Sequence, residues 1–319
     1  MKKKIACITL SCVLLFSVAV LGINAQAPTE PKIVFMTDRD GNFEVYIMNK
    51  DGSNPQNLSN NPADDFAPRW SPDGTTIAFV SGRDHMGWEG DVYLMDPDGS
   101  NQRSVANTPE GEQDLGWSPD GKQIVMEVNI APRQIFVMDS DGENRLQLTD
   151  ETMADNQQPS FCPDGRIAFT SGRDGNGEVY LMDADGGNQT RITNHPATDR
   201  EPTCSPDNTQ IAFWSDRAGD LEVFVTGIDG GDARNITRTP GHHWPSHWSA
   251  DGSEILFTSE RDGNGEIYIM NSDGSNQVNL TNHPGYDDRP DLFEPGAGTA
   301  VSPNGRFKAT WGWIKKKTE

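Results

Sequence analysis

Short apolar stretches alternate with polar, glycine-rich turns along most of the chain, and the pattern recurs at a nearly constant interval. A phrase of the type Glu-Val-Tyr-Leu-Met-Asp-x-Asp-Gly occurs six times, beginning at Glu44, Asp91, Gln134, Glu178, Glu222 and Glu266. The intervals are 47, 43, 44, 44 and 44 residues. A second phrase, Ser-Pro-Asp-Gly or a close variant, runs in step with the first and begins at Ser71, Ser118, Cys162, Ser205 and Ser249. Repetition at this period indicates a repeat architecture.

Each unit predicts four short strands. From Gln158 the chain reads "QPSFC", "RIAFTS", "VYLMD" and "QTRIT", separated by "PDG", "GRDGNGE" and "ADGGN". Proline at the second turn position and glycine at its end suit a type I turn, and Asp-Gly is a tight-hairpin signal. We find no helical periodicity in the repeats.

The strand "VYLMD" is apolar on both faces, so it needs a sheet packed against each face. Four-stranded units of about 44 residues satisfy this by stacking radially as a β-propeller. We therefore predict an all-β, six-bladed propeller of four-stranded antiparallel blades over residues 32–293. The chain enters at a second strand, Lys32–Thr37, and the missing first strand reappears at Asp288–Phe293. Strands from the two ends of the chain should share one blade and close the ring.

The first 25 residues read as a signal peptide. Three lysines precede an apolar run from Ile5 to Ile23, and small residues follow at Ala25 and Ala27. We expect cleavage after Ala25 and a periplasmic or secreted protein, with an uncleaved membrane anchor as the alternative. Residues 294–319 form a C-terminal tail, read either as a decayed half-repeat or as a solvated basic end.

The chain is strongly acidic, with 48 Asp and Glu against 26 Lys and Arg and a net charge of −22. This charge excludes nucleic acid and anionic membrane surfaces as expected partners, and it favours a soluble monomer. Beyond the signal peptide only Cys162 and Cys204 remain. Export permits a disulfide between them, but two buried free thiols fit the sequence equally well.

The segments "WSPDGTTIAFVSGRD" and "DVYLMDPDGSN" resemble the WD40-like PD40 repeat of TolB-type propellers, and the resemblance extends over residues 32–293. It implies a non-catalytic binding role with a protein or peptide partner in the periplasm or cell envelope. TolB-type proteins also carry an α/β domain before the propeller. Here the first predicted strand begins about seven residues after the predicted signal peptide, so we expect the propeller alone.

Two classes of enzyme use similar propellers and are alternatives to a binding role. Prolyl-oligopeptidase-type enzymes add an α/β-hydrolase domain, yet the chain contains no G-x-S-x-G motif. Oligogalacturonate lyases, which place a metal on channel histidines, are the alternative function. The cluster His242, His243 and His247 is poorly spaced for one ion on a strand, so we expect no metal. The Asp-rich turns lack the full EF-hand pattern, which leaves calcium as a minor alternative to no cofactor.

Two positions at the start of each innermost strand are predicted to line one mouth of the channel. The first of these positions is occupied by Asp65, Glu112, Asn156, Asp199, His243 and Asp287. The next is occupied by Phe66, Gln113, Gln157, Arg200, Trp244 and Asp288. We predict that eleven of these twelve residues, all except Gln157, form the partner-binding site, with Trp244 as an anchor and the acids attracting a basic or amphipathic peptide. An acidic rim would also repel a uronate.

The alternative for the acidic position is structural: each acid pairs with an arginine of the same face. A recurrent arginine at the tip of the second hairpin, found at Arg39, Arg83, Arg173, Arg217 and Arg261, is read as such a structural group. The third repeat departs from this pattern with "EVNIAPRQIF". The aromatic position at Trp70, Trp117 and Trp248 is read as core.

Overall fold

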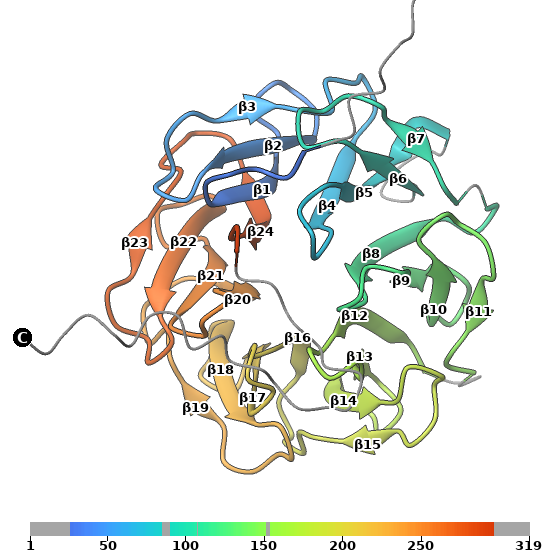
Figure 1. Cartoon of the computed structure of the whole chain (residues 1–319). Helices are drawn as coiled ribbons and strands as arrows, with labels where there is room; N and C mark the ends of the chain where they lie inside the picture. Colours follow the sequence, from blue (N-terminus) through green and yellow to red (C-terminus); the bar gives the residue numbers. More distant parts are fainter. Residues whose placement is uncertain (1–25, 85–89, 107, 151–153, 297–319) are drawn as a thin grey trace, which may run out of the picture.

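Six four-stranded antiparallel sheets form a closed ring in the computed structural model, which describes residues 26–84, 90–106, 108–150 and 154–296 (Figure 1). The predicted all-β, six-bladed propeller is therefore confirmed. Within the described ranges the one helical element is a short 3-10 turn, η1 (Gly82–Asp84), and no helix is long and apolar enough to cross a membrane. The predicted signal peptide and residues 297–319 of the predicted tail lie outside the described residues.

The blades are numbered here in chain order, and their strands are given from the channel outward. Blade 1 contains β24 (Asp287–Phe293), β1 (Lys32–Thr37), β2 (Glu44–Asn49) and β3 (Gln56–Asn57). Blade 2 contains β4 (Asp65–Trp70), β5 (Ile77–Ser81), β6 (Asp91–Met95) and β7 (Arg103–Ser104). Blade 3 contains β8 (Glu112–Trp117), β9 (Gln123–Val128), β10 (Gln134–Asp139) and β11 (Leu146–Gln147).

The remaining blades repeat the same order. Blade 4 contains β12 (Asn156–Phe161), β13 (Ile167–Ser171), β14 (Glu178–Met182) and β15 (Thr190–Arg191). Blade 5 contains β16 (Asp199–Cys204), β17 (Gln210–Ser215), β18 (Glu222–Gly227) and β19 (Arg234–Asn235). Blade 6 contains β20 (His243–Trp248), β21 (Glu254–Ser259), β22 (Glu266–Asn271) and β23 (Val278–Asn279).

Blade 1 is assembled from both ends of the described chain. Strand β24 pairs antiparallel with β1, with Leu292 opposite Ile33. The predicted sharing of one blade is confirmed, and the closing strand begins at Asp287, one residue earlier than predicted. The pairing covers the inner edge of β1 and gives blade 1 the same four strands as the other five blades.

The hydrophobic core of the described residues consists of six clusters; five lie between two neighbouring blades, and one contains residues of blades 1, 2 and 3. Five of the blades place a fully buried phenylalanine at the same position of the second strand: Phe35, Phe79, Phe169, Phe213 and Phe257. Burying such a ring contributes about 1.5–3 kcal/mol. Each sheet packs against a neighbouring blade on both of its faces. The middle strands are therefore apolar throughout, instead of alternating between apolar and polar residues.

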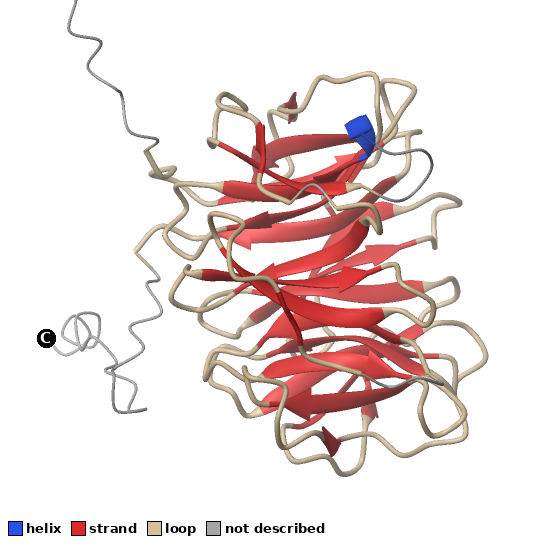
Figure 2. Cartoon of the chain, turned by 90° about the vertical axis from the view of Figure 1, so that its right-hand side faces the viewer, coloured by secondary structure: helices blue, strands red, loops and turns tan. Residues whose placement is uncertain are grey.

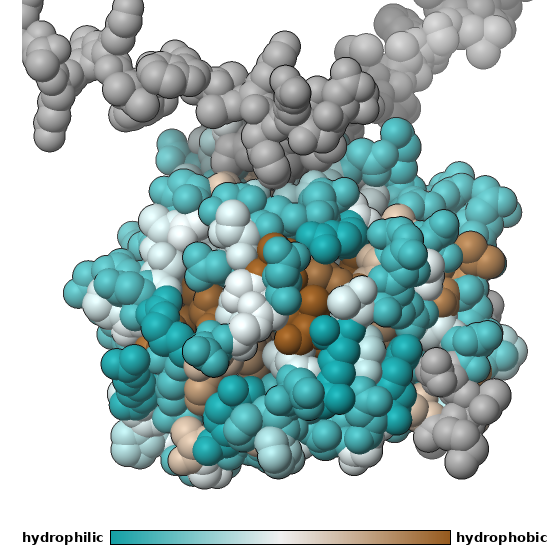
Figure 3. Space-filling view, turned by 90° about the horizontal axis from the view of Figure 1, so that it is seen from below, coloured by the Kyte–Doolittle hydropathy of each residue, from teal (hydrophilic) through white to brown (hydrophobic). Residues whose placement is uncertain are grey.

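The channel has two distinct ends. We call one the tip end, because the loops joining the second and third strands of each blade lie there. The other is the turn end, which carries the Ser-Pro-Asp-Gly turns. Each innermost strand runs from the tip end to the turn end. The edge-on view shows the strands lying between two faces that are covered by loops (Figure 2). The outer wall is mostly hydrophilic, with apolar side chains visible in a patch bordered by polar ones (Figure 3).

Candidate functional site

The predicted acidic position at the tip end is buried in all six blades. Asp65, Glu112, Asn156, Asp199, His243 and Asp287 each have an exposed fraction of 0%. The prediction that the acids form an accessible rim is therefore wrong. Four of them are held by an arginine at 2.7–3.0 Å, in the pairs Arg83–Asp65, Arg145–Glu112, Arg217–Asp199 and Arg39–Asp287. The structural alternative, an arginine pair for each acid, describes these four blades.

The tip arginines are fixed by more than their carboxylates. Arg217, for example, donates from Nε to the Ser215 hydroxyl at 2.9 Å and stacks over the rings of Phe213 and Phe224. Burial raises the pKa of Asp65 and of Asp199, even though the paired arginines act to lower it. Removing one partner of such a buried pair is costly, because it leaves the other charge uncompensated.

Blades 3, 4 and 6 depart from this arrangement in different ways. In blade 4 the tip arginine, Arg173, donates at 3.1 Å to the amide oxygen of Asn156, which stands in the place of the acid. Blade 3 lacks the tip arginine, and Arg145, from the turn between β10 and β11, donates to Glu112 Oε1 at 3.0 Å in its place.

In blade 6 the acid is replaced by His243. Among the described residues, Arg261 Nη2 and His243 Nδ1 have no hydrogen-bond partner. Burial, together with nearby Arg261, lowers the pKa of His243 to about 4, so this histidine is neutral near pH 7.

The second predicted position is only partly accessible. Phe66, Gln157 and Asp288 are buried, whereas Gln113, Arg200 and Trp244 are half-buried. The Trp244 indole N–H donates to Asp288 Oδ1 at 2.8 Å, so the residues of two adjacent blades are tied together here. The role of the predicted residues in partner binding stays a prediction. Of that set, Trp244 alone lines the cavity described next.

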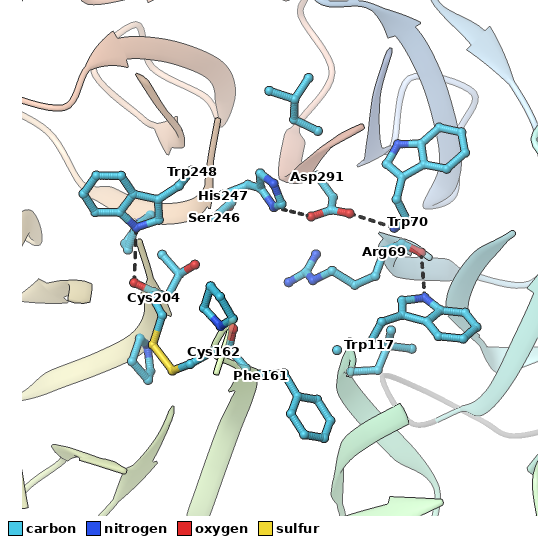
Figure 4. Close-up of a pocket in the computed structure, with 18 of the residues that line it drawn as sticks. Arg69, Trp70, Trp117, Phe161, Cys162, Cys204, Ser246, His247, Trp248 and Asp291 are labelled. Carbon is cyan, nitrogen blue, oxygen red and sulfur yellow. Dashed lines mark hydrogen bonds and ion pairs between the residues drawn. A yellow bond between two sulfur atoms is a disulfide. The ribbon is translucent and has the colours of Figure 1, made fainter. Parts of the chain in front are cut away.

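A cavity of about 290 Å³ lies in the channel and is lined from the Ser-Pro-Asp-Gly turns inward to Trp244 (Figure 4). We call it the funnel. All six innermost strands contribute to its wall, and prolines of the turns surround its mouth: Pro72, Pro119, Pro163 and Pro206. The wall contains Trp117 and Phe161, both half-buried, so the aromatic position predicted as core serves the funnel as well.

Irregular backbone shapes the middle of the channel. Four innermost strands have a left-handed residue at the same position, with φ between 51° and 55°: Ala67, Gln158, Glu201 and Arg289. The strand register shifts at each of these points. A bulge of this kind bends the strand and redirects the following side chains. Left-handed backbone is disfavoured for residues other than glycine, and such strain is concentrated at functional sites.

Most charges in the funnel wall are paired. Arg289 forms an ion pair with Asp114, and His247 Nδ1 lies 2.6 Å from Asp291 Oδ1. Asp291 also accepts a hydrogen bond from the backbone N–H of Trp70 at 2.7 Å. Burial acts to raise the pKa of Asp291, but His247 outweighs it and holds this pKa below its usual value. The buried surroundings of Arg289, with Arg69 nearby, lower its pKa to about 10.

Glu201 and Arg69 differ from those pairs. Glu201 accepts a hydrogen bond from the Gln158 amide at 2.9 Å. Burial, together with nearby Asp288, raises the pKa of Glu201 to about 8. Arg69 donates to the Pro68 carbonyl at 2.9 Å, and in the described part of the chain no carboxylate lies within ion-pair distance of it.

The sequence reasoning overlooked the residues that define the funnel, namely Arg69, Glu201, Arg289 and Asp291. They occupy the third and fifth positions of the innermost strands, just beyond the two positions that were aligned. The signal that could have indicated them is a charged residue inside a strand whose other residues pack in the ring. His247, considered as a metal ligand, is engaged by Asp291. In the described ranges no group of three or more His, Cys, Asp or Glu is placed to hold a metal.

A disulfide between Cys162 and Cys204 joins blade 4 to blade 5 beside the funnel and settles the alternative left open by the sequence. At other junctions an indole links the blades: Trp117 Nε1 donates to the Arg69 carbonyl, and Trp248 Nε1 donates to the Thr203 carbonyl, both at 3.2 Å. Cys204 occupies the position of these tryptophans. A covalent bond thus replaces the indole hydrogen bond at one junction.

Comparison with known proteins shows which of them resemble this chain in sequence or in fold. The "Tol-Pal system protein TolB" of Desulfosudis oleivorans is 39% identical over 54 residues, which is 17% of this chain and 12% of that protein. The crystal structure of TolB from Acinetobacter baumannii matches with a TM-score of 0.70 and 23% identity, covering 82% of this chain and 66% of that one. Oligogalacturonate lyase from Vibrio parahaemolyticus matches with a TM-score of 0.55 and 15% identity, covering 79% and 75%.

Both structural likenesses show the fold alone, because their sequence identity is low. The family is shown by a different comparison. The family model described as the TolB β-propeller domain, PD40, matches residues 19–167 and 151–243. These matches cover well over half of the chain and coincide with the repeats that build the blades. The protein therefore belongs to the TolB β-propeller (PD40) family.

Proposed function

We propose that this chain is an exported, non-catalytic binding propeller that holds a protein or peptide of the cell envelope in its funnel. The observation that supports this proposal is the funnel itself, where aromatic, proline and charged side chains from six blades line one cavity. A cavity of about 290 Å³ lies near the lower end of the usual range for ligand sites, about 300–1,000 Å³. An extended peptide segment or a single inserted side chain suits this volume.

The family and the sequence support the envelope setting. The curated relative is named as a protein of the Tol-Pal system, and residues 1–25 have the layout of a signal peptide. We extend both to this chain as part of the proposal: the signal is cleaved, the mature protein is periplasmic or secreted, and it works as a monomer without a cofactor.

The test is site-specific photo-crosslinking in the native envelope. A photoreactive amino acid is placed at Ser160 in the funnel, at His242 at the tip end, or at Thr190 on the outer wall. The proposal expects one defined protein adduct from the funnel position and none from Thr190. An adduct from His242 alone would move the binding surface to the tip end, where the sequence had predicted it.

A second variant set tests the same surface without a crosslinker. Ser160→Trp should fill the funnel and abolish capture of the crosslinked partner, whereas Thr190→Trp adds the same bulk to the exposed outer strand β15 and should not. Circular dichroism of both variants checks that the ring has formed. Equal binding by the two variants would contradict a funnel site.

The alternative enzymatic function, a metal-dependent lyase, has the shared fold in its favour. Metal analysis of the purified protein decides between the two. A stoichiometric transition metal, together with cleavage of oligogalacturonate, would replace the binding role with catalysis.

A further inference from the structure

Arg69 is the one cation of the funnel without an ion-pair partner among the described residues. It lies on β4, two residues after the left-handed Ala67, and its guanidinium points toward the middle of the pocket (Figure 4). Its backbone is held in place, because its carbonyl accepts the Trp117 indole N–H at 3.2 Å. The Pro68 carbonyl uses one of its five N–H donors. The remaining donors face the cavity.

Most other charges that line the funnel have a closer partner of their own. Arg289 pairs with Asp114, and Asp291 Oδ1 lies 2.6 Å from His247 Nδ1. At the mouth, Glu294 shares Lys50 with Glu254, at 2.8 Å and 2.7 Å. Glu201 has a pKa of about 8 and is largely protonated at neutral pH. The Arg69 guanidinium is thus the charged group of the wall that keeps most of its donors free, although its charge contributes to lowering the pKa of Asp291.

A guanidinium with free N–H donors in a narrow cavity can bind an anion. Planar guanidinium groups bind carboxylates through two parallel hydrogen bonds, and such charge-assisted bonds are stronger than neutral ones. The aromatic rings of Trp117, Phe161 and Trp244 line the same cavity and offer apolar contact to the groups beside the anion. The wall therefore combines one anionic subsite with an aromatic surround.

From this geometry we infer that Arg69 anchors a carboxylate of the bound peptide, either an Asp or Glu side chain or a free C-terminus. The inference rests on the proposed peptide-binding function and adds the chemistry that the peptide must carry. It also reverses the expectation from sequence of a basic peptide, because the four aligned acids of the tip end are buried in ion pairs. An acidic sugar presents the same carboxylate, and the experiment separates the two sources.

The experiment uses the purified mature protein and a random pentapeptide library with free C-termini. Bound peptides are sequenced for the wild type, for Arg69→Gln and for the matched control Arg103→Gln, which removes an exposed arginine from the outer strand β7. We expect peptides enriched in Asp and Glu, or peptides whose binding is lost on C-terminal amidation. Their affinity should fall at least tenfold in Arg69→Gln, the equivalent of about 1.4 kcal/mol, and should be unchanged in Arg103→Gln.

The outcomes that contradict the inference are distinct. Selected peptides without an acidic preference, or with equal affinity for Arg69→Gln, would overturn the role of Arg69 and leave the proposed function standing. Failure of the funnel position Ser160 to crosslink any protein, with no peptide selected, would overturn both. Binding of digalacturonate through Arg69, without peptide binding, would assign the subsite to a sugar and overturn the peptide.

Folding provides a readout that needs no ligand. Arg69→Gln removes a charge without an ion-pair partner, so its melting temperature should equal or exceed that of the wild type. A large decrease would mean that Arg69 is a structural residue, which would also overturn the inference. Arg69→Lys should fold equally well but bind the selected peptides more weakly, because an ammonium group cannot form the bidentate pair.

Discussion

At the tip end of the channel four arginines each lie against a buried carboxylate, whereas at the turn end Arg69 points into an open cavity with no ion-pair partner in the described part of the chain. All five arginines lie on an innermost strand or against one, but their physical roles differ. Where the carboxylate is supplied by the same blade, arginine stabilises the fold. Where it is not supplied, the donors stay available to a ligand. Arg261 at the tip end also lacks a carboxylate among the described residues, but it does not line the cavity. The proposed subsite therefore depends on two features together, a missing partner and an open cavity.

The largest expected effect comes from breaking a tip-end pair. Asp199→Ala leaves the guanidinium of Arg217 without its carboxylate in a buried position. The free energy of unfolding should fall by about 3–5 kcal/mol, as measured by chemical denaturation. Asp232→Ala, which removes an exposed aspartate of the same blade, is the control and should change it little. A loss below 1 kcal/mol for Asp199→Ala would mean that the tip-end pairs do not hold the ring.

The carboxyl group of Glu201 in the funnel wall should make stability depend on pH. Its pKa rises from 4.5 in the unfolded chain to about 8 in the folded protein. Between these values the folded state binds more protons, so stability is full below about pH 4.5 and decreases as the pH rises through about 8. Glu201→Gln should therefore have little effect at pH 4.5 and should stabilise the protein increasingly toward pH 8. Melting temperatures of both proteins across this range check it, and parallel curves would contradict it.

In blade 6 a single substitution can supply the ion pair that the tip end lacks there. His243→Asp supplies the carboxylate that Arg261 lacks among the described residues. We expect the free energy of unfolding to increase by about 1–3 kcal/mol, the cost commonly attached to an unsatisfied buried group. His242→Asp changes the exposed neighbour instead and should be nearly neutral. If both variants behave alike, the pairing in the other blades does not account for the stability of this end.

The smallest effect concerns the bulges between the two ends. Ala67 has a left-handed φ of 51°, whereas Ala78, on the adjacent strand, is equally buried without that conformation. Glycine relieves the strain at the first position and merely weakens the strand at the second. Ala67→Gly should thus be more stable than Ala78→Gly by about 1–2 kcal/mol. Equal thermal stability of the two variants would show that the left-handed residue is not strained.

The ring could be predicted from the sequence because it is repeated: the interval of 43 to 47 residues and the apolar middle strands leave a propeller as the consistent architecture. Closure by Lys32–Thr37 followed from the same register. The funnel could not be predicted in this way. Its bulges fall on Ala67, Gln158, Glu201 and Arg289, which share no residue type, and none of them is the glycine or asparagine that usually signals left-handed backbone.

The partners of individual side chains were equally hard to predict from the sequence. The acids Asp65 and Asp199 were aligned correctly, but whether an aligned acid is a rim or a buried partner depends on the arginine that folds over it. Arg145 could not be identified as the replacement in blade 3, because it comes from a different turn. The disulfide joins Cys162 and Cys204 from two different repeat positions, so only the stacking of blades brings them together.

Closure by β24 also sets the order in which the molecule can be completed. Ile33 and its partner Leu292 lie on the first and the last of the described strands. Blades 2 to 6 can form from contiguous sequence, but the inner edge of β1 has no hydrogen-bonding neighbour until the residues up to β24 have been synthesised. Contacts so distant along the chain form slowly. Until they form, the nascent chain carries an open strand edge, a feature that makes folding intermediates prone to aggregation.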